Sequence, residues 1–194
     1  AATPALSFTE WQGMALGARA HLYIDHPEAR AIAAEAEAEI ARLEAIFSLY
    51  TDSSLAQLNR LGRLEAPPFD LLECLALCDS VYQATGGVFD PTIQPVWALY
   101  AESYAAGAAP SEEQVYAALA RTGWSRLRYD EASVTLEPGM ALTLNGVAQG
   151  FIADRVGALL KARGLSHVLV DTGEFNALGP QSNGAPWPVR LTAG

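Results

Sequence analysis

Residues 141–170 read A-L-T-L-N-G-V-A-Q-G-F-I-A-D-R-V-G-A-L-L-K-A-R-G-L-S-H-V-L-V and hold the elements that decide the fold class. The segment 141–144 is predicted to be a strand, and apolar residues at helical spacing predict a helix over residues 148–163. Gly164 is a typical end signal for that helix. The apolar run 167–170 then predicts a further strand.

The rest of the chain mixes strands and helices without strict alternation, which favours an α+β fold of mixed sheets with packed helices. Each expected helix start is marked by a polar residue that could cap the helix. The expected helix starts lie at Asp25-His26-Pro27-Glu28, Asp52-Ser53-Ser54, Asp70 and the capping box Ser111 to Gln114. Other expected strands cover residues 15–24, 126–130, 133–137 and 189–192. Pro91 and Pro95 predict that no regular helix or central strand forms between them.

The composition is that of a globular domain, and we expect residues 1–194 to form one domain. Hydrophobic residues make up 51% of the chain, and the formal net charge is −10. Such an acidic chain without a basic stripe excludes a nucleic-acid partner, and the absence of 18 consecutive apolar residues excludes a membrane span. An acidic protein that binds a phosphate ligand needs backbone N–H groups, a helix N-terminus or a cation.

The cysteines and histidines show no pattern of a metal site or catalytic triad. Cys74 and Cys78 lie four apart on an expected helix, and we interpret them as buried free thiols, because a disulfide within one helix is awkward. The three histidines are far apart in the sequence and are interpreted as unrelated.

Three loops are candidates for ligand binding, and each has a plain structural alternative. Tyr50 could stack on a flat ring system or belong to the core. Asp90 could receive a donor group of a ligand or cap the next segment. Gly146 and Gly150 could let the backbone of a helix N-terminus approach a phosphate, or could serve only the turn. The third loop does not read G-x-G-x-x-G, so a Rossmann site is poorly supported.

The order of these loops resembles the ApbE family, the FAD:protein FMN transferases. The family segment F-S-x-Y-x-x-x-S-x-L-x-x-L-N is matched over residues 47–59, and T-G-G-A-F-D-P-T is matched over residues 85–92 with one conservative change. The motif D-L-G-G-I-A-K-G-Y-x-x-D is similar to residues 143–154. Leu16-Gly17-Ala18 stands where the family has Met-Gly-Thr, and Trp187 where a Trp opens a strand.

The resemblance implies an ApbE-like, T-fold-like architecture and a magnesium-dependent enzyme that moves FMN from FAD to a threonine of an acceptor protein, with release of AMP. The FAD-contacting positions of the family correspond to Leu16, Tyr50, Val88, Phe89, Asp90, Thr143 and Gln149. The backbone carbonyl of Gly146 takes the position of a Mg²⁺ ligand. No catalytic base is implied for this chain.

The chain also departs from the family pattern. The family has an acid at the Thr143 position and a Lys or Glu at the Gln149 position, and its Gly-Gly pair reads Thr172-Gly173 here. The other metal ligands of the family belong to a segment resembling D-A-x-x-T-A, which does not occur up to Gly194. We therefore expect the C-terminal part of the domain to be missing from this sequence.

The wording T-L-N-G-V-A-Q-G resembles the NosX-like subgroup, which is linked to nitrous oxide respiration. That resemblance implies a membrane flavoprotein with a periplasmic FMN domain as the acceptor. The N-terminus A-A-T-P-A-L-S-F has no starting Met, no basic region and no apolar region, so we expect a periplasmic protein whose export signal has been removed.

Three other functions compete with FMN transfer. The first is a non-catalytic protein that binds or delivers FAD, favoured by the uncharged residues at Thr143 and Gln149. The second is an FAD pyrophosphatase, in which water replaces the threonine. The third is a scaffold for assembly of a respiratory reductase that binds no flavin.

Overall fold

The computed structural model describes residues 9–24, 26–172, 175–181 and 183–187. The chain divides into two compact units, of which unit 1 combines residues 1–43 with residues 149–194 and unit 2 covers Glu44–Ala148. Each unit contains helices and an antiparallel sheet, which confirms the predicted α+β class. The assignment of residues 1–194 to a single domain stays a prediction.

The sheet of unit 1 is antiparallel throughout and has the order β1-β2-β6-β7. Its strands are β1 (Thr9–Ala15), β2 (Ala18–Ile24), β6 (Val168–Asp171) and β7 (Phe175–Leu178). The prediction of a strand at 167–170 is therefore confirmed with a shift of one residue. The strand expected at 189–192 lies outside the described residues.

The prediction of one strand over residues 15–24 is wrong, because the chain reverses direction inside that stretch. β1 ends at Ala15 and β2 begins at Ala18, and the two strands pair as a hairpin. Leu16 and Gly17 form the turn with φ values of 50° and 81°. Both residues thus adopt the positive φ values that two-residue hairpin turns require. Glycine reaches this region freely, whereas leucine seldom does.

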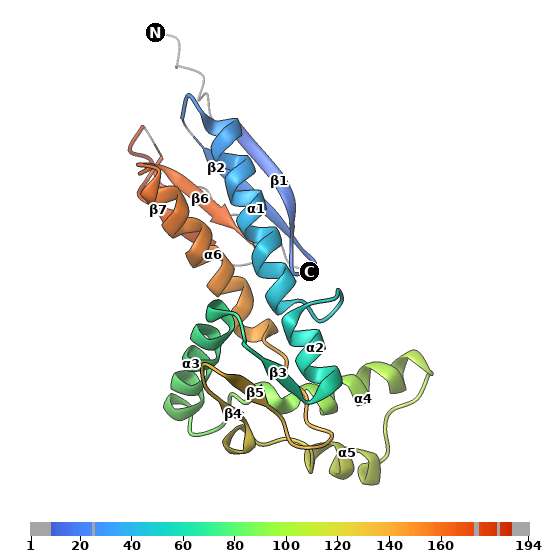
Figure 1. The fold of residues 1–194 in the computed structure, drawn as a ribbon. Coiled ribbons are helices and arrows are strands. Elements are labelled where there is room, and N and C mark those ends of the chain that lie inside the picture. The colour runs from blue at the N-terminus through green and yellow to red at the C-terminus, as the bar shows by residue number, and fades with distance from the viewer. Residues whose placement is uncertain (1–8, 25, 173–174, 182, 188–194) are drawn as a thin grey trace. The chain divides into compact units, whose positions relative to one another are not determined.

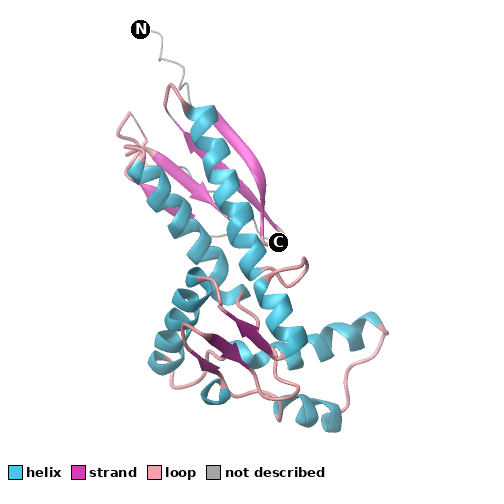
Figure 2. Ribbon diagram, viewed as in Figure 1, coloured by secondary structure: helices cyan, strands magenta, loops and turns pink. Residues whose placement is uncertain are grey.

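Two long helices cover one face of this sheet (Figures 1 and 2). They are α1 (Ala29–Phe47) and α6 (Asn145–Ala162), and each belongs to unit 1 over most of its length. The guanidinium of Arg163 donates to the carboxylate of Glu35, which links the two helices at the surface. The apolar face predicted for α1 is confirmed, since the following residues are all buried: Ile32, Ala36, Ile40, Leu43 and Phe47.

Unit 2 is built around a small antiparallel sheet of order β3-β5-β4, which Figure 2 shows among the helices of the unit. In chain order its elements are α2 (Ser54–Leu61), β3 (Arg63–Glu65), α3 (Phe69–Ala84), the 3₁₀ turn η1 (Pro91–Ile93), α4 (Gln94–Ala105), α5 (Glu112–Leu119), the 3₁₀ turn η2 (Trp124–Arg126), β4 (Arg128–Tyr129) and β5 (Ser133–Thr135). The hairpin expected near residues 126–137 is confirmed in a shorter form.

Three capping signals in unit 2, at Ser53, Gly62 and Ser111, act as the sequence predicts, whereas α3 begins at Phe69 without a side-chain cap and Asp70 lies in its first turn. The Ser53 hydroxyl accepts a hydrogen bond from the backbone N–H of Ala56 at 3.0 Å, and Gly62 ends α2 in the left-handed conformation with φ 73°. Ser111 and Gln114 form a reciprocal capping box at the start of α5. These caps satisfy backbone groups that a helix end leaves unpaired, so they fix where each helix begins and ends.

Two predictions in unit 2 are wrong. The stretch with Pro91 and Pro95 does form a helix, because Pro95 lies in the first turn of α4, where its missing N–H has no intrahelical partner to lose. Residues 141–144 are not a β-strand. They run as an irregular segment in which the N–H of Thr143 donates to the carbonyl of Pro91 at 2.9 Å. At least one backbone N–H of this segment is therefore paired with the second loop and not with a neighbouring strand.

The core of unit 2 contains both cysteines. Cys74 and Cys78 are free and fully buried on α3, which confirms their interpretation as thiols. A hydrogen bond with Cys78 and burial raise the pKa of the Cys74 thiol far above its usual range. Among the described residues, every helix is too short or too polar to cross a lipid bilayer.

Candidate functional site

The first loop is shaped by two buried serines between α1 and α2. The Ser48 hydroxyl accepts hydrogen bonds from the N–H groups of Tyr50 at 3.1 Å and Thr51 at 3.2 Å. The Ser53 hydroxyl donates to the carbonyl of Ser48 and also caps α2. The ring of Tyr50 is 76% exposed, so the core interpretation of this residue is wrong. The hydrogen bonds of Ser48 and Ser53 thus hold the backbone of the loop, and the ring of Tyr50 faces solvent.

Asn59 joins the first loop region to the third. Its side-chain amide donates to the carbonyl of Leu142 at 2.8 Å and accepts from the N–H of Leu142 at 2.7 Å. The side chain therefore pairs with the backbone as a neighbouring strand would. The sequence places Asn59 in a motif but does not reveal this role, because the partner lies 83 residues away.

The second loop begins as the C-terminal cap of α3. The Thr85 hydroxyl donates to the carbonyl of Val81 at 2.8 Å and accepts from the N–H of Phe89 at 3.1 Å. Gly86 and Gly87 both have positive φ, at 62° and 84°. The two glycines allow a tight reversal that a side chain would strain. The reversal leaves Val88 89% exposed and Phe89 half-buried.

Asp90 acts as a capping carboxylate in the structure, as its plain interpretation predicts. One carboxylate oxygen accepts from the N–H of Thr92 at 2.8 Å and from its hydroxyl at 2.6 Å. The other oxygen accepts from the N–H of Trp124 at 3.3 Å. The Thr92 hydroxyl also accepts from the N–H of Gly123 at 2.6 Å. Asp90 therefore organises this loop, and a contact between Asp90 and FAD stays a prediction.

The second and third loops come together within unit 2. The hydrogen bond from Thr143 to Pro91 joins their backbones. A Cβ atom placed on Gly146 would lie only 3.3 Å from the ring of Phe89, so the ring lies against the start of α6. Three of the predicted ligand positions, Phe89, Thr143 and Gly146, are thereby brought into one region.

The entrance of α6 borders a cavity of about 500 Å³. Thr143, Asn145 and Gly146 form one wall of this cavity, and residues of η1 and α4 form the other. The Thr143 hydroxyl accepts from the N–H of Asn145 at 3.4 Å, which caps the helix weakly. The first N–H groups of an α-helix have no intrahelical partner and carry a partial positive charge. In α6 the N–H groups of Val147 and Ala148 donate to the carbonyl of Leu144, and that of Asn145 donates to Thr143. Within the described residues the N–H of Gly146 is therefore the donor that this entrance offers to a phosphate.

Two predicted contacts, Leu16 and Gln149, belong to unit 1. Leu16 forms the β1–β2 turn and is partly exposed. Gln149 lies on α6, where its backbone carbonyl accepts a hydrogen bond from the buried hydroxyl of Thr172 at 3.2 Å. The side chain of Gln149 is partly exposed. Their contacts with FAD stay predictions.

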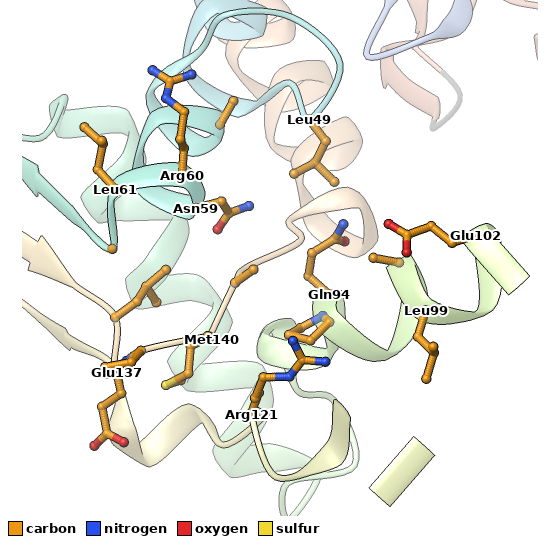
Figure 3. A pocket seen from close by; sticks show the side chains of 18 residues that line it. Leu49, Asn59, Arg60, Leu61, Gln94, Leu99, Glu102, Arg121, Glu137 and Met140 are labelled. Atoms are coloured by element: carbon orange, nitrogen blue, oxygen red, sulfur yellow. The ribbon is translucent and has the colours of Figure 1, made fainter. Parts of the chain in front are cut away.

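A larger cavity of about 940 Å³ lies elsewhere in unit 2 (Figure 3). Its walls come from α2, α4 and the segment after β5, and Figure 3 shows Arg60, Gln94 and Arg121 around it. Gln94 has a buried side-chain oxygen that has no hydrogen-bond partner among the described residues. None of the predicted FAD or metal positions lines this cavity, so we do not assign it to the candidate site.

The histidines make separate local contacts, as predicted. The Nδ1 atom of His26 accepts from the N–H of Glu28 at 3.0 Å, and that of His167 lies 2.7 Å from the carbonyl of Pro180. His21 lies 3.5 Å from the carboxylate of Glu10. In the described part of the chain, no group of three or more His, Cys, Asp or Glu side chains could hold a metal ion.

A comparison with models of known protein families shows to which family the chain belongs. The model of the ApbE family matches residues 14–193. The chain belongs to the ApbE family. The prediction made from its loops is confirmed, while membership of the NosX-like subgroup stays a prediction. The ApbE match also covers every predicted site residue, from Leu16 to Gln149.

Curated ApbE relatives carry the name FAD:protein FMN transferase. The one from Chlamydia muridarum is 26% identical over 149 residues, which is 73% of this chain and 46% of the relative. The one from Klebsiella pneumoniae is 28% identical over 126 residues, which is 63% of this chain and 39% of the relative. The chain thus spans less than half the length of these curated relatives.

Solved ApbE structures have the same fold. The flavinyl transferase ApbE of Pseudomonas stutzeri, in its apo form, matches with a TM-score of 0.83 at 27% identity over 95% of this chain and 62% of that one. The H257G mutant of the flavin transferase ApbE of Vibrio cholerae matches with a TM-score of 0.86 at 21% identity over 96% of this chain and 68% of that one. The ApbE-like architecture predicted from sequence is therefore confirmed.

Proposed function

We propose that this protein moves FMN from FAD to a threonine of an acceptor protein and releases AMP. The observation that carries the proposal is the meeting of Phe89 with Gly146 in unit 2, because it joins two motifs of the family at the start of one helix. The names of the curated relatives support the same reaction. The acceptor hydroxyl would form a bond to the phosphorus nearest riboflavin, and the bond from that phosphorus to AMP would break.

The helix entrance supports the placement of the diphosphate in this proposal. Among the described residues, the lining of the cavity at Thr143 and Gly146 includes no Lys or Arg, so these residues supply neutral donors there. The backbone N–H of Gly146 at the start of α6 would donate to a phosphate oxygen, as N–H groups at helix N-termini do. The exposed side chains of Tyr50 and Val88 are available to pack against the flavin ring.

We propose Mg²⁺ as the cation that neutralises the diphosphate. The residues that line the cavity carry three candidate oxygen ligands, which are the Thr143 hydroxyl, the Asn145 side-chain amide oxygen and the Gly146 carbonyl. Oxygen donors suit Mg²⁺, which commonly retains water and binds substrate phosphates as well. No carboxylate belongs to the described lining of this cavity. Binding of Mg²⁺ should therefore depend on FAD.

Calorimetry tests this dependence directly. Mg²⁺ is titrated into the protein alone and into the protein saturated with FAD, and FAD is titrated with and without Mg²⁺. We expect measurable Mg²⁺ binding only in the presence of FAD. Tight binding of Mg²⁺ to the FAD-free protein would contradict a site held mainly by the phosphates of FAD.

The reaction is tested with the protein, FAD, Mg²⁺ and a soluble, flavin-free acceptor domain that carries FMN on a threonine when mature. We expect AMP in the supernatant and a fluorescent flavin on the acceptor in a denaturing gel. An acceptor with its threonine changed to valine should remain unlabelled. The proposal is wrong if neither AMP nor a labelled acceptor rises above the background without protein.

Non-catalytic delivery of FAD is the second candidate, and the absence of a carboxylate from the described cavity lining favours it. It predicts tight FAD binding without AMP. FMN and AMP formed without any acceptor would instead indicate a pyrophosphatase.

The remaining parts of the proposal concern where the reaction occurs and on what. We propose a periplasmic location and, as acceptor, a membrane flavoprotein with an FMN domain on that side. Fractionation of cells that express the natural gene with an added C-terminal tag tests the location.

A further inference from the structure

One side of α4 presents aromatic side chains to solvent beside the candidate phosphate site. The set consists of Val96, Trp97, Tyr100 and Tyr104 of α4 together with Ile93 of the preceding turn η1, and is called here the α4 aromatic surface. Trp97 is 63% exposed and Tyr104 is 64% exposed. Together with Thr143, Asn145 and Gly146, the surface encloses the cavity of about 500 Å³.

Burial of the core does not explain these side chains. Within the described residues Pro95 is the only residue of α4 that is buried. The rings of Tyr100 and Tyr104 lie with their centroids 6.1 Å apart and contact each other at a tilt of 36°. Contiguous exposed apolar surface of this kind usually marks a binding site. We therefore expect a ligand or partner to bind to this surface.

The position of the surface relates it to the reacting end of FAD. The cavity is lined by the proposed phosphate and metal positions Thr143 and Gly146, and its lining does not include the proposed flavin contacts Tyr50 and Val88. A transferase must bring a hydroxyl group to the phosphorus that it transfers. Within unit 2, an acceptor hydroxyl that enters this cavity would lie between the α4 aromatic surface and the start of α6.

The size and chemistry of the surface fit a polypeptide segment. With a rise of 1.5 Å per helical residue, the distance along the helix from Ile93 to Tyr104 is about 16 Å. That length corresponds to about five residues of extended chain and exceeds a single adenine ring. The described residues of the lining carry no charged side chain. Trp and Tyr are among the residues that most often dominate the energy of protein–protein contacts.

We propose that the α4 aromatic surface docks the apolar segment that flanks the target threonine of the acceptor protein. This inference rests on the proposed FMN transfer and names the part of the protein that recognises the acceptor. The hydroxyl of the threonine would then lie over the entrance of α6, and the flanking residues would pack on Trp97 and Tyr104.

The test compares Trp97→Ala and Tyr104→Ala with Tyr116→Ala. Tyr116 is a matched control because it is 73% exposed on α5 and does not line the cavity. The probe is the soluble, flavin-free acceptor domain, and KM is measured separately for this domain and for FAD. We expect each of the first two variants to raise KM for the acceptor about 10-fold or more, as contact hot spots do, with KM for FAD within about twofold. Tyr116→Ala should match the wild type.

Binding of the Thr→Val acceptor domain, measured by calorimetry, gives a readout that needs no turnover. A loss of affinity of about 10-fold in Trp97→Ala supports docking even if no FMN is transferred. A failure of the proposed FMN transfer can thus be distinguished from a failure of the proposed docking. The inference is overturned if both variants bind and react like the wild type, or if KM for FAD rises in place of KM for the acceptor. It is also overturned if the wild-type protein does not bind the domain. Circular dichroism and Tm identify any variant that fails to fold.

Discussion

The side-chain amide of Asn59 forms two hydrogen bonds with the backbone of Leu142, one in each direction. This pair fixes the irregular segment 141–144 against α2, and the segment leads directly into the α6 entrance. A residue on a helix thus positions the backbone that precedes the candidate phosphate site. The pair gives Asn59, a residue of the first motif, a structural role.

Asn59→Leu should therefore destabilise the protein and weaken FAD binding together. The substitution leaves the N–H and carbonyl of the buried Leu142 without their partner, at a cost of about 1–3 kcal/mol for each group. Urea unfolding measures the loss of stability, and FAD titration measures the effect on the entrance.

Asn59→Asp and Gln57→Ala are the controls for this prediction. The carboxylate that Asn59→Asp introduces would still accept from the N–H of Leu142, so its effect should lie between the wild type and Asn59→Leu. Gln57 is exposed on the same helix, and its truncation should change stability by less than about 0.5 kcal/mol. Equal stability of Asn59→Leu and wild type would contradict the role given to this pair.

Thr92→Val should destabilise the second loop although it keeps the size of the side chain. The hydroxyl of Thr92 donates to Asp90 and accepts from Gly123, and the residue is fully buried. Removal of the hydroxyl leaves the N–H of Gly123 unpaired, and we expect a loss of about 1–3 kcal/mol in urea unfolding. Thr122→Val is the matched comparison at a partly exposed threonine and should have a smaller effect. A loss no larger than that of Thr122→Val would contradict this prediction.

Alanine at Gly146 and at Gly150 should have different effects on stability. At Gly150 an added Cβ meets nothing within 4 Å, so alanine should stabilise the helix by about 0.5–1 kcal/mol. At Gly146 the added Cβ meets the ring of Phe89 at 3.3 Å, and this contact should cancel the gain. In the background of Phe89→Leu, Gly146→Ala should regain its stabilising effect. Identical unfolding curves for Gly146→Ala and Gly150→Ala would show that Phe89 does not crowd this position.

The stability of the protein should fall in alkaline solution because of Cys74. Its pKa is raised in the folded state by the hydrogen bond with Cys78 and by burial, so the folded protein keeps a proton that the unfolded chain loses above about pH 8.5. The contribution of Cys74 to the free energy of unfolding is therefore complete below about pH 8.5. Above that pH it decreases by about 1.4 kcal/mol per pH unit. Urea unfolding at pH 7.5 and at pH 9.8 measures this slope. Cys74→Ala should reduce it, and an unchanged slope would exclude Cys74 as the cause.

Local signals made much of the fold predictable. Ser53, Gly62 and the capping box at Ser111 act on backbone within a few residues, so a sequence reveals them directly. The hairpin turn at Leu16 could not be predicted in this way. The flanking alternation runs through it without a break, and leucine is an unusual residue for a positive φ.

The candidate site depends on contacts between distant segments, and these were less predictable. The family resemblance identified the three loops, but no local pattern shows that Thr143 bonds to Pro91 or that Phe89 lies against Gly146. The prediction for the two-proline segment is wrong because the effect of a proline depends on its position within a helix. Pro95 in the first turn of α4 starts a helix that the same residue would break a few positions later.

The hydroxyl groups of Ser48, Ser53 and Thr85 shape the first two loops through hydrogen bonds to the main chain. Interactions between neutral groups are screened very little by dissolved ions, unlike the contacts between charged side chains at a protein surface. A change of ionic strength will alter how this acidic molecule attracts charged ligands, yet the first loop, which Ser48 and Ser53 hold through such neutral bonds, will keep its conformation. An effect of salt on FAD affinity therefore reports on charged groups, namely the diphosphate, its cation and the Asp90 carboxylate, and not on a rearrangement of the first loop.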